Sequence, residues 1–121
     1  MTPRVSVVMS VFNDAETLHS AIASIQSQTL QDWQLIIIDD GSTDATPTIL
    51  REYSQHDERI QVQTNSTNQG LAASLNRGWR IAKSELIARM DADDLSHPGR
   101  LAQQVAFLET HQEIDVLGTS A

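Results

Sequence analysis

Three carboxylates fall within four residues at the end of a short apolar run. Asp91, Asp93 and Asp94 follow residues 86–90, and this pattern predicts a buried strand that ends in acids. At such close range the three charges repel one another unless a cation neutralises them. Carboxylate oxygens suit Mg²⁺ or Mn²⁺. The alternative is that the cluster has only a local structural role, because the chain contains ten Asp residues and acids are common at helix starts.

Polar side chains also follow the other predicted strands, in residues 10–14, 39–42 and 65–70. Because the carboxyl ends of parallel strands share one edge of a sheet, we expect these segments to meet the acids in one crevice. Asp14 and Asp44 are placed to cap the helices that follow them. Asp39 directly follows an apolar strand and precedes the next helix by four or five residues, which favours contact with a ligand. A metal ion at this edge would hold a nucleotide diphosphate and stabilise its charge as it leaves.

Alternating strands and helices must position these residues. Short apolar runs predict strands over residues 5–9, 34–38, 60–63 and 86–90, with another from 115. Helical spacing of apolar residues predicts helices over 14–28, from 43 or 44, over 71–83 and over 98–111. In the third helix, Leu71, Leu75, Trp79 and Ala82 lie on one stripe. This order predicts a single α/β domain whose sheet is mainly parallel and carries helices on both faces.

Composition removes several classes of function. The net charge of −8 argues against a nucleic-acid surface, and 4% aromatic residues are too few for a base-stacking platform. The absence of cysteine excludes disulfides, thiolate metal sites and cysteine nucleophiles. Apolar runs of four to five residues cannot span a bilayer, and no signal-peptide pattern opens the chain. The glycine motifs of dinucleotide-binding folds, P-loop NTPases and serine hydrolases do not occur.

Four motifs together resemble a known family. The segments VSVVMSVFND, IIIDDGSTDAT, NQGLAASLNRG and IARMDADDLSHPGRL occur in the order and spacing of the family 2 glycosyltransferases with the GT-A fold. The resemblance covers nearly the whole chain and implies a three-layer α/β/α fold. It also implies an inverting transferase that uses a nucleoside-diphosphate sugar, UDP-linked, and Mn²⁺ or Mg²⁺. The implied role is the synthesis of bacterial surface polysaccharide on a glycan or lipid-linked acceptor.

The resemblance assigns roles to individual positions. Phe12 matches the aromatic residue that packs on the nucleotide base, with Ser10 and Asn13 beside it. Asp39 matches the base-recognising carboxylate, with Asp40 next to it. Asp91 matches the acid near the ribose and diphosphate, and Asp93, together with Asp91, matches the metal ligands. The third motif contributes Asn68, Gly70, Asn76 and Gly78 to the nucleotide pocket, although a loop and a close helix contact explain the two glycines equally well.

The chain departs from the family pattern at two points. Gly99 stands where the family often has an acid, which affects only a helix start. The family's catalytic domain also continues past Ala121 into an acceptor-binding half that carries the general base. We therefore expect residues 1–121 to be the nucleotide-sugar-binding half of a truncated GT-A domain, which binds its donor without turnover. The full-length protein is expected in the cytoplasm, at the periphery of the inner membrane, and exposed apolar surface of the fragment favours self-association.

Two other functions remain open from the sequence. A nucleotidyltransferase would use similar acids and a metal, but it needs a glycine-rich, basic loop after the first strand, where this chain has Val11, Phe12, Asn13 and Asp14. A non-catalytic module would use the half-domain only for binding or association. Metal-dependent binding of a nucleoside diphosphate separates the transferase from both alternatives.

Overall fold

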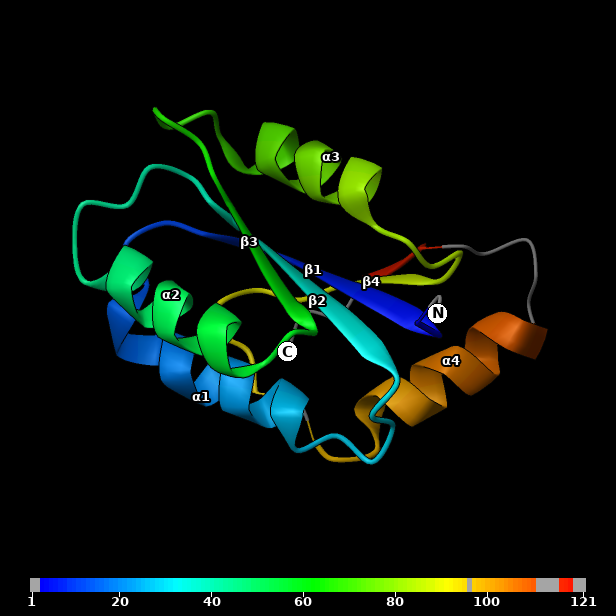
Figure 1. Ribbon diagram of the computed structural model, residues 1–121. Coiled ribbons are helices and arrows are strands. Elements are labelled where there is room, and N and C mark those ends of the chain that lie inside the picture. The colour runs from blue at the N-terminus through cyan, green and yellow to red at the C-terminus, as the bar shows by residue number, and fades with distance from the viewer. Residues whose placement is uncertain (1–2, 96, 111–115, 119–121) are drawn as a thin grey trace.

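The computed structural model describes residues 3–95, 97–110 and 116–118. Strands and helices alternate along this part of the chain (Figure 1). The strands are β1 (Val5–Val11), β2 (Trp33–Asp39), β3 (Ile60–Thr64), β4 (Ile87–Arg89) and β5 (Val116–Gly118). The helices are α1 (Ala15–Gln26), α2 (Thr46–His56), α3 (Leu71–Ile81) and α4 (Arg100–Thr110). This is the element order that the sequence predicts.

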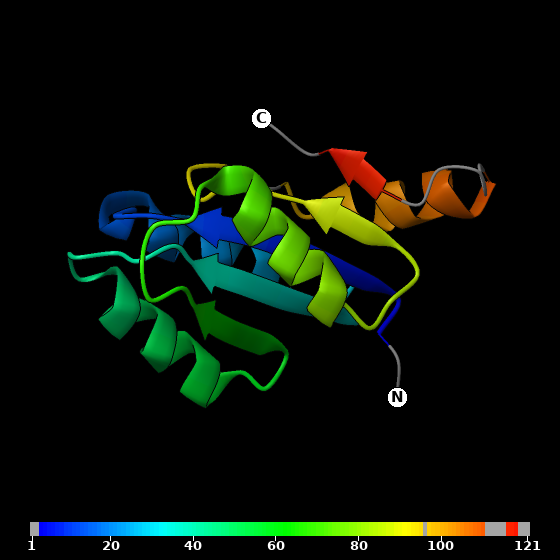
Figure 2. The ribbon, with the colours of Figure 1, turned by 90° about the horizontal axis from the view of Figure 1, so that it is seen from above.

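The strands form one sheet in the order β3-β2-β1-β4-β5. All of its strand pairs are parallel, and the arrows in Figure 2 point the same way. The central strand β1 pairs with β2 along its whole length, from Val5 opposite Trp33 to Val11 opposite Asp39. Every residue of β2 is buried, as expected for an apolar strand covered on both faces. The predicted parallel α/β sheet is confirmed.

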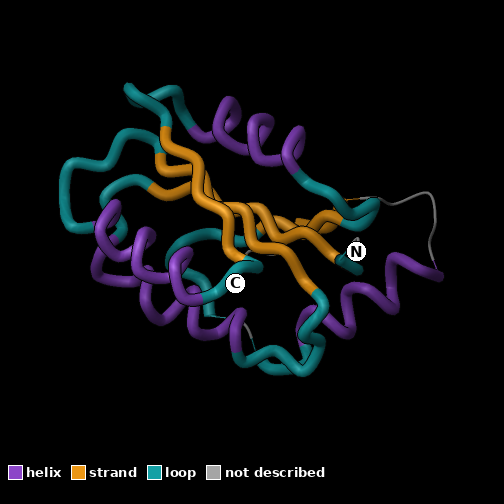
Figure 3. Tube along the Cα trace, in the orientation of Figure 1, coloured by secondary structure: helices purple, strands orange, loops and turns teal. Residues whose placement is uncertain are grey.

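Helices cover both faces of the sheet and give three layers (Figures 1 and 3). Helices α1, α2 and α4 lie on one face, and α3 lies on the other. On the three-helix face, alternate strand residues pack with buried helix residues into one core, which includes Val7, Met9, Leu35, Ile37, Leu18, Ile22, Leu50 and Leu101. Within the described ranges, none of the helices has both the length and the apolar character needed to cross a membrane.

Helix α3 packs on the sheet through its small residues. Ser74 and Gly78 are the buried residues of α3, and a Cβ on Gly78 would lie 2.5 Å from Cγ1 of Val8 on β1. Leu71 and Trp79, by contrast, are 51% and 39% exposed. The apolar stripe that helical spacing singles out is therefore not the face that packs on the sheet. Close approach of the helix backbone to β1 requires a residue without a side chain at the contact.

Several element boundaries differ from the prediction by a few residues. Strand β1 extends to Val11 and β2 to Asp39, because each still pairs with its neighbour there. Helix α2 begins at Thr46 rather than at residue 43 or 44, and α4 begins at Arg100 rather than at residue 98. The predicted end of the last helix at 111 and the start of the last strand at 115 lie outside the described residues.

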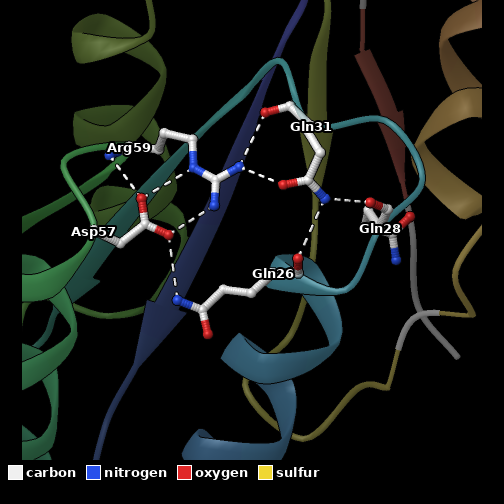
Figure 4. Close-up of polar contacts among 5 residues, drawn as sticks. All are labelled: Gln26, Gln28, Gln31, Asp57 and Arg59. Atoms are coloured by element: carbon white, nitrogen blue, oxygen red, sulfur yellow. Dashed lines mark hydrogen bonds and ion pairs between the residues drawn. The ribbon is translucent and has the colours of Figure 1, made fainter.

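Polar side chains join the amino-terminal ends of β2 and β3 to helix α1 (Figure 4). Arg59 donates to both carboxylate oxygens of Asp57, at 3.0 Å from Nε and 2.9 Å from Nη2, and its Nη1 donates to two oxygens of Gln31. Gln26 donates to Asp57 at 3.2 Å. The Arg59 guanidinium also stacks on the buried ring of Trp33, 3.8 Å from its centroid. We call Gln26, Gln31, Trp33, Asp57 and Arg59 the clasp.

The buried side chain of Gln28 connects α1 to the start of α4. Its Oε1 accepts a hydrogen bond from the Leu101 backbone amide at 2.9 Å, and its Nε2 donates to the His97 carbonyl at 2.8 Å. The Thr29 amide adds a bond to the Pro98 carbonyl at 2.7 Å. A side chain 73 residues away in sequence thus satisfies a backbone donor in the first turn of α4. This anchors the segment that follows the acidic cluster.

Candidate functional site

The loops that follow β1, β2, β3 and β4 leave the sheet at one edge, because the strands are parallel. Two of these loops touch through backbone atoms. A Cβ on Gly41, whose φ is +81°, would lie 3.2 Å from the Asn68 amide nitrogen and 3.3 Å from the Thr67 carbonyl carbon. The loop after β2 therefore packs directly on the loop after β3. The loops after β2 and β3 thus lie side by side at this edge of the sheet.

The loop after β1 presents Phe12 to solvent and holds the loop after β2. Phe12 is 45% exposed, although it directly follows a fully buried strand residue. Asn13 adopts a left-handed conformation with φ of 51°. Its side-chain Oδ1 accepts hydrogen bonds from the backbone amides of Thr43 at 2.7 Å and Asp44 at 3.3 Å. Its backbone amide donates to Ser42 Oγ at 2.9 Å. Asn13 thus fixes the turn after β2, and the Phe12 ring beside it stays exposed.

Asp44 caps the helix that follows it, as the sequence predicts, whereas the capping prediction for Asp14 is wrong. Asp44 Oδ1 accepts from the Thr46 amide at 2.8 Å, at the start of α2. Asp14 occupies the N-cap position of α1, but its carboxylate accepts from the preceding Phe12 amide at 2.8 Å instead of from the helix. Hydrogen bonds from the hydroxyl and amide of Thr46 hold the pKa of Asp44 below its ordinary value. Both acids shape the loops around the site.

One carboxylate oxygen of Asp39 makes no hydrogen bond within the described part of the chain. The residue is 1% exposed, and its Oδ1 accepts a hydrogen bond from the Ser42 amide at 3.0 Å. Its buried Oδ2 finds no hydrogen-bond partner among the described residues. Asp39 also lines a cavity of about 210 Å³ next to α2 and β3. A buried acceptor without a partner costs stability, so this atom is a strong candidate for contact with a ligand.

The adjacent Asp40 is fully occupied by hydrogen bonds within the chain. Its Oδ1 accepts from the Gln69 amide at 2.7 Å and from Asn65 Nδ2 at 2.9 Å, and its Oδ2 accepts from the Gly70 amide at 3.0 Å. Burial alone would raise the pKa of Asp40, but these hydrogen bonds outweigh it and hold the pKa below its ordinary value. Asp40 therefore holds the loop after β3 as a buried carboxylate.

The acidic cluster after β4 is compact. One carboxylate oxygen each of Asp91, Asp93 and Asp94 lies within 4.8 Å of the others. Asp94 is 5% exposed, and its Oδ2 accepts from the Asp91 amide at 3.2 Å, which stabilises the turn. Asp91 Oδ1 is 3.2 Å from Nη2 of Arg89, and Asp93 is exposed. Asp94 therefore supports the turn that carries the other two acids.

The other residues predicted to bind the nucleotide-sugar donor lie in different parts of the fold. Ser10 is half-buried near the end of β1, and Asn68 is exposed on the loop after β3. Gly70 has a φ of +92° directly before α3, which favours glycine on conformational grounds. Asn76 is exposed on α3, whereas Gly78 is buried against β1, away from the loops. Gly78 thus fits the predicted close helix contact.

Sequence reasoning missed Asn65, Ser74 and Arg77, which hold the loop after β3 from behind. Asn65 Nδ2 donates to Asp40 and also to Ser74 Oγ at 3.0 Å, and Arg77 donates to Asn65 Oδ1. The one available signal was the position of Asn65 at the start of the polar segment 65–70 that follows a predicted strand. Nothing in the local pattern connects it to a residue of the next helix.

The comparisons decide the family. A family model described as glycosyl transferase family 2 matches residues 6–121 of this chain. The chain belongs to glycosyltransferase family 2. It is 49% identical over 118 residues to EpsE of Bacillus subtilis (strain 168), a protein assigned as a glycosyltransferase. That match covers 97% of this chain but 42% of EpsE, so this family 2 chain spans less than half of its relative.

Solved structures confirm the GT-A fold of this family 2 chain. TarS of S. aureus in complex with UDP-GlcNAc superposes with a TM-score of 0.82 at 24% identity, over 90% of this chain and 32% of that one. The mannosyltransferase PcManGT of Pyrobaculum calidifontis, in complex with GDP-Man and Mn²⁺, gives a TM-score of 0.76 at 26% identity. That match covers 88% of this chain and 32% of the mannosyltransferase. Each match therefore covers about a third of the solved chain.

Proposed function

We propose that this chain binds a UDP-sugar, the donor of an inverting glycosyltransferase. The transferase passes the sugar from UDP to a glycan or lipid-linked acceptor. The observation that carries the proposal is the buried Oδ2 of Asp39, which has no hydrogen-bond partner among the residues that the structure describes, at the sheet edge that also presents exposed Phe12. The acidic cluster follows β4, which pairs with β1 on the side opposite β2. Membership of glycosyltransferase family 2 supports the reaction class.

The geometry of Asp39 favours uracil over guanine as the base. Oδ1 already accepts from the Ser42 amide, so one carboxylate oxygen remains for the ligand. Uracil offers a single imide N–H, which suits one acceptor, whereas guanine offers two adjacent donors that suit both oxygens of a carboxylate. Phe12 supplies an exposed aromatic face on which the same base can stack.

The acidic cluster suits a divalent cation of the Mg²⁺ or Mn²⁺ type. Its donor atoms are all carboxylate oxygens, and they come close enough together to share one ion. Asp93 and Asp91 would hold it, because an oxygen of the more deeply buried Asp94 is engaged by the Asp91 amide. A bound cation would neutralise the negative charge that grows on the diphosphate. The complex of PcManGT with Mn²⁺ supports the choice of ion.

This chain's residues then bind and orient the donor. Phe12 and Asp39 fix the base, and the cluster fixes the diphosphate end, so the anomeric carbon is presented to an acceptor hydroxyl. Attack by that hydroxyl forms the new glycosidic bond while the bond to the diphosphate breaks, and the hydroxyl proton passes to a base. We assign that base to the acceptor-binding part of the longer protein, beyond Ala121, and expect residues 1–121 to bind without turnover.

Calorimetric titration of the chain with UDP, GDP and ATP, each with and without Mn²⁺, tests the proposal. We expect Mn²⁺-dependent binding of UDP, weaker binding of GDP, and at least a tenfold weaker affinity for UDP in Asp93→Ala. Asp32→Ala is the matched control, because it removes an exposed carboxylate just before the amino-terminal end of β2. Metal-independent binding of ATP, or no nucleotide binding at all, would show the proposal to be wrong.

A further inference from the structure

Arg77 on helix α3 donates hydrogen bonds to the end of strand β3. Its Nη1 donates to the Thr64 carbonyl at 3.1 Å and to the side-chain oxygen of Asn65, and its Nη2 donates to Gln63 Oε1 at 3.2 Å. All three acceptors are neutral, so Arg77 forms no ion pair with them. One half-buried guanidinium therefore binds three consecutive residues, at the point where β3 leaves the sheet.

The contact continues from Asn65 to the loop after β3. Arg77 occupies Asn65 Oδ1, and this turns Asn65 Nδ2 toward Asp40 Oδ1 at 2.9 Å. Asp40 in turn accepts from the consecutive backbone amides of Gln69 and Gly70. Ser74 Oγ, which is fully buried, accepts the other hydrogen of Asn65 Nδ2 at 3.0 Å. The relay of Arg77, Asn65 and Asp40 thus determines where residues 65–70 lie.

This loop is in contact with the turn that carries Asp39. Gly41 packs on the backbone of Thr67 and Asn68, and the neighbouring Ser42 amide donates to Asp39 Oδ1. A shift of residues 65–70 would remove the support behind Gly41 and move the amide that orients Asp39. Arg77 itself is separated from the base-binding atoms by this whole chain of contacts.

We propose that Arg77 is a positioning residue for the nucleotide donor, acting through Asn65 and Asp40 on the loop after β3 and on Asp39. This inference rests on the proposed function, because it assumes that Asp39 contacts the base. Arg77 suits this role better than a lysine would, since its planar group reaches acceptors in two directions at once. A lysine ammonium on the same helix position could replace one of the contacts but could not hold all three residues together.

Three variants test the inference: Arg77→Ala, Arg77→Lys and, as matched control, Arg80→Ala. Arg80 lies three residues further along the same helix, is exposed and carries the same charge. The dissociation constant for UDP with Mn²⁺ is measured by calorimetry, and the exchange rates of the Gln69 and Gly70 amide hydrogens are measured by NMR. We expect the dissociation constant to rise about tenfold or more in Arg77→Ala and about threefold or more in Arg77→Lys. Both amides should exchange faster in these variants, while Arg80→Ala should resemble the wild type.

The outcomes separate the inference from the function on which it rests. If the wild type does not bind UDP, the proposed function is wrong and the inference fails with it. If the wild type binds UDP and Arg77→Ala binds as tightly as Arg80→Ala, only the inference is wrong. Weaker binding with unchanged exchange at Gln69 and Gly70 would also overturn it, because the loop would not be the route. If Arg77→Ala does not fold, Arg77→Lys decides by the same two measurements.

Discussion

Asp39 and Asp40 are consecutive residues whose carboxylates lie on opposite faces of the sheet edge. Asp39 lines a cavity with residues of α2, whereas Asp40 bonds to the loop that leads into α3 and, through Asn65, to Ser74 of that helix. The alternation of side chains along an extended chain accounts for the separation. One acid retains a free acceptor atom, and the other is saturated by the fold. Two identical neighbours therefore have different expected effects when they are changed.

Asp39→Asn and Asp40→Asn should affect different properties. Asp39→Asn removes the free acceptor, and loss of one charge-assisted hydrogen bond of about 1.5–3 kcal/mol should weaken UDP binding tenfold or more without lowering the free energy of unfolding. Asp40→Asn places an amide among the Gln69 and Gly70 donors and should cost about 1–3 kcal/mol of stability. Urea unfolding and calorimetric titration measure the two effects. Equal loss of stability in both variants would contradict the distinction.

Phe12→Ala should weaken nucleotide binding without weakening the fold. The ring is already 45% exposed, so its removal takes little apolar area out of the core. Stacking of an aromatic side chain on a base is worth about 1–3 kcal/mol, which corresponds to at least a several-fold rise in the dissociation constant for UDP. Phe107→Ala is the matched control, because Phe107 on α4 is 40% exposed. The prediction fails if both variants bind UDP equally well.

Gly78→Ala should destabilise the protein by about 1–3 kcal/mol. The added Cβ would meet Val8 Cγ1 at 2.5 Å, so α3 or β1 must shift to accept it. The Val8→Ala change should relieve this contact, and the double variant should lose less stability than the sum of the two single variants. Chemical denaturation measures all four proteins of the cycle. Gly99→Ala, where a Cβ would meet its nearest neighbour at 3.8 Å, is the tolerated control. Strict additivity would argue against the proposed contact.

Acid should remove the contribution of the clasp to stability. Hydrogen bonds from the Arg59 side chain hold the pKa of Asp57 below its ordinary value, and burial opposes them only in part. A carboxyl whose pKa is lower in the folded state stabilises the fold above its unfolded pKa of about 4. That stabilisation is lost as the pH falls through the lower, folded pKa. Asp57→Asn should therefore be less stable than the wild type at pH 7, by about 1–3 kcal/mol, and should lose less stability below pH about 4.

The measurement is the free energy of unfolding in urea between pH 7 and pH 3 for the wild type and Asp57→Asn. Glu58→Gln serves as the control, because it neutralises an adjacent exposed carboxylate outside the clasp. Parallel pH profiles for the wild type and Asp57→Asn would contradict the prediction. The lowered pKa of Asp40 acts in the same direction and remains in both proteins, so the comparison isolates Asp57.

The sequence predicts the framework well because strands and helices of this fold differ in periodicity and separate cleanly. The apolar run of β2 and the β-branched residues of β1 are buried as expected, and their parallel pairing places the polar loops at one edge. The acids after β4 were also predictable as a cluster. Their spacing along the chain is short, so no distant contact is needed to bring them together.

Contacts between distant residues could not be read from the sequence. The apolar stripe of α3 was an obvious candidate for the packing face, but the close approach at Gly78 turns Leu71 and Trp79 to the surface. Asp40 resembled a second ligand residue beside Asp39, and only its bonds to Gln69 and Gly70 show that it supports a loop. Gln28 and Arg77 have ordinary helical surroundings in the sequence, and their roles depend on partners in other elements.

The stacking of Arg59 on Trp33 gives the protein an internal optical reporter. Trp33 is 1% exposed at the start of β2, and the chain's other tryptophan, Trp79, lies 39% exposed in the last turn of α3. The segment after α3 returns to the amino-terminal ends of β1 and β2, where Lys83 and Ser84 bond to Gln34 and Ser6. Both indoles therefore belong to the end of the domain away from Phe12 and Asp39. Intrinsic emission should report the opening of the clasp on unfolding, with a red shift as Trp33 meets water, and stay nearly silent when a nucleotide binds.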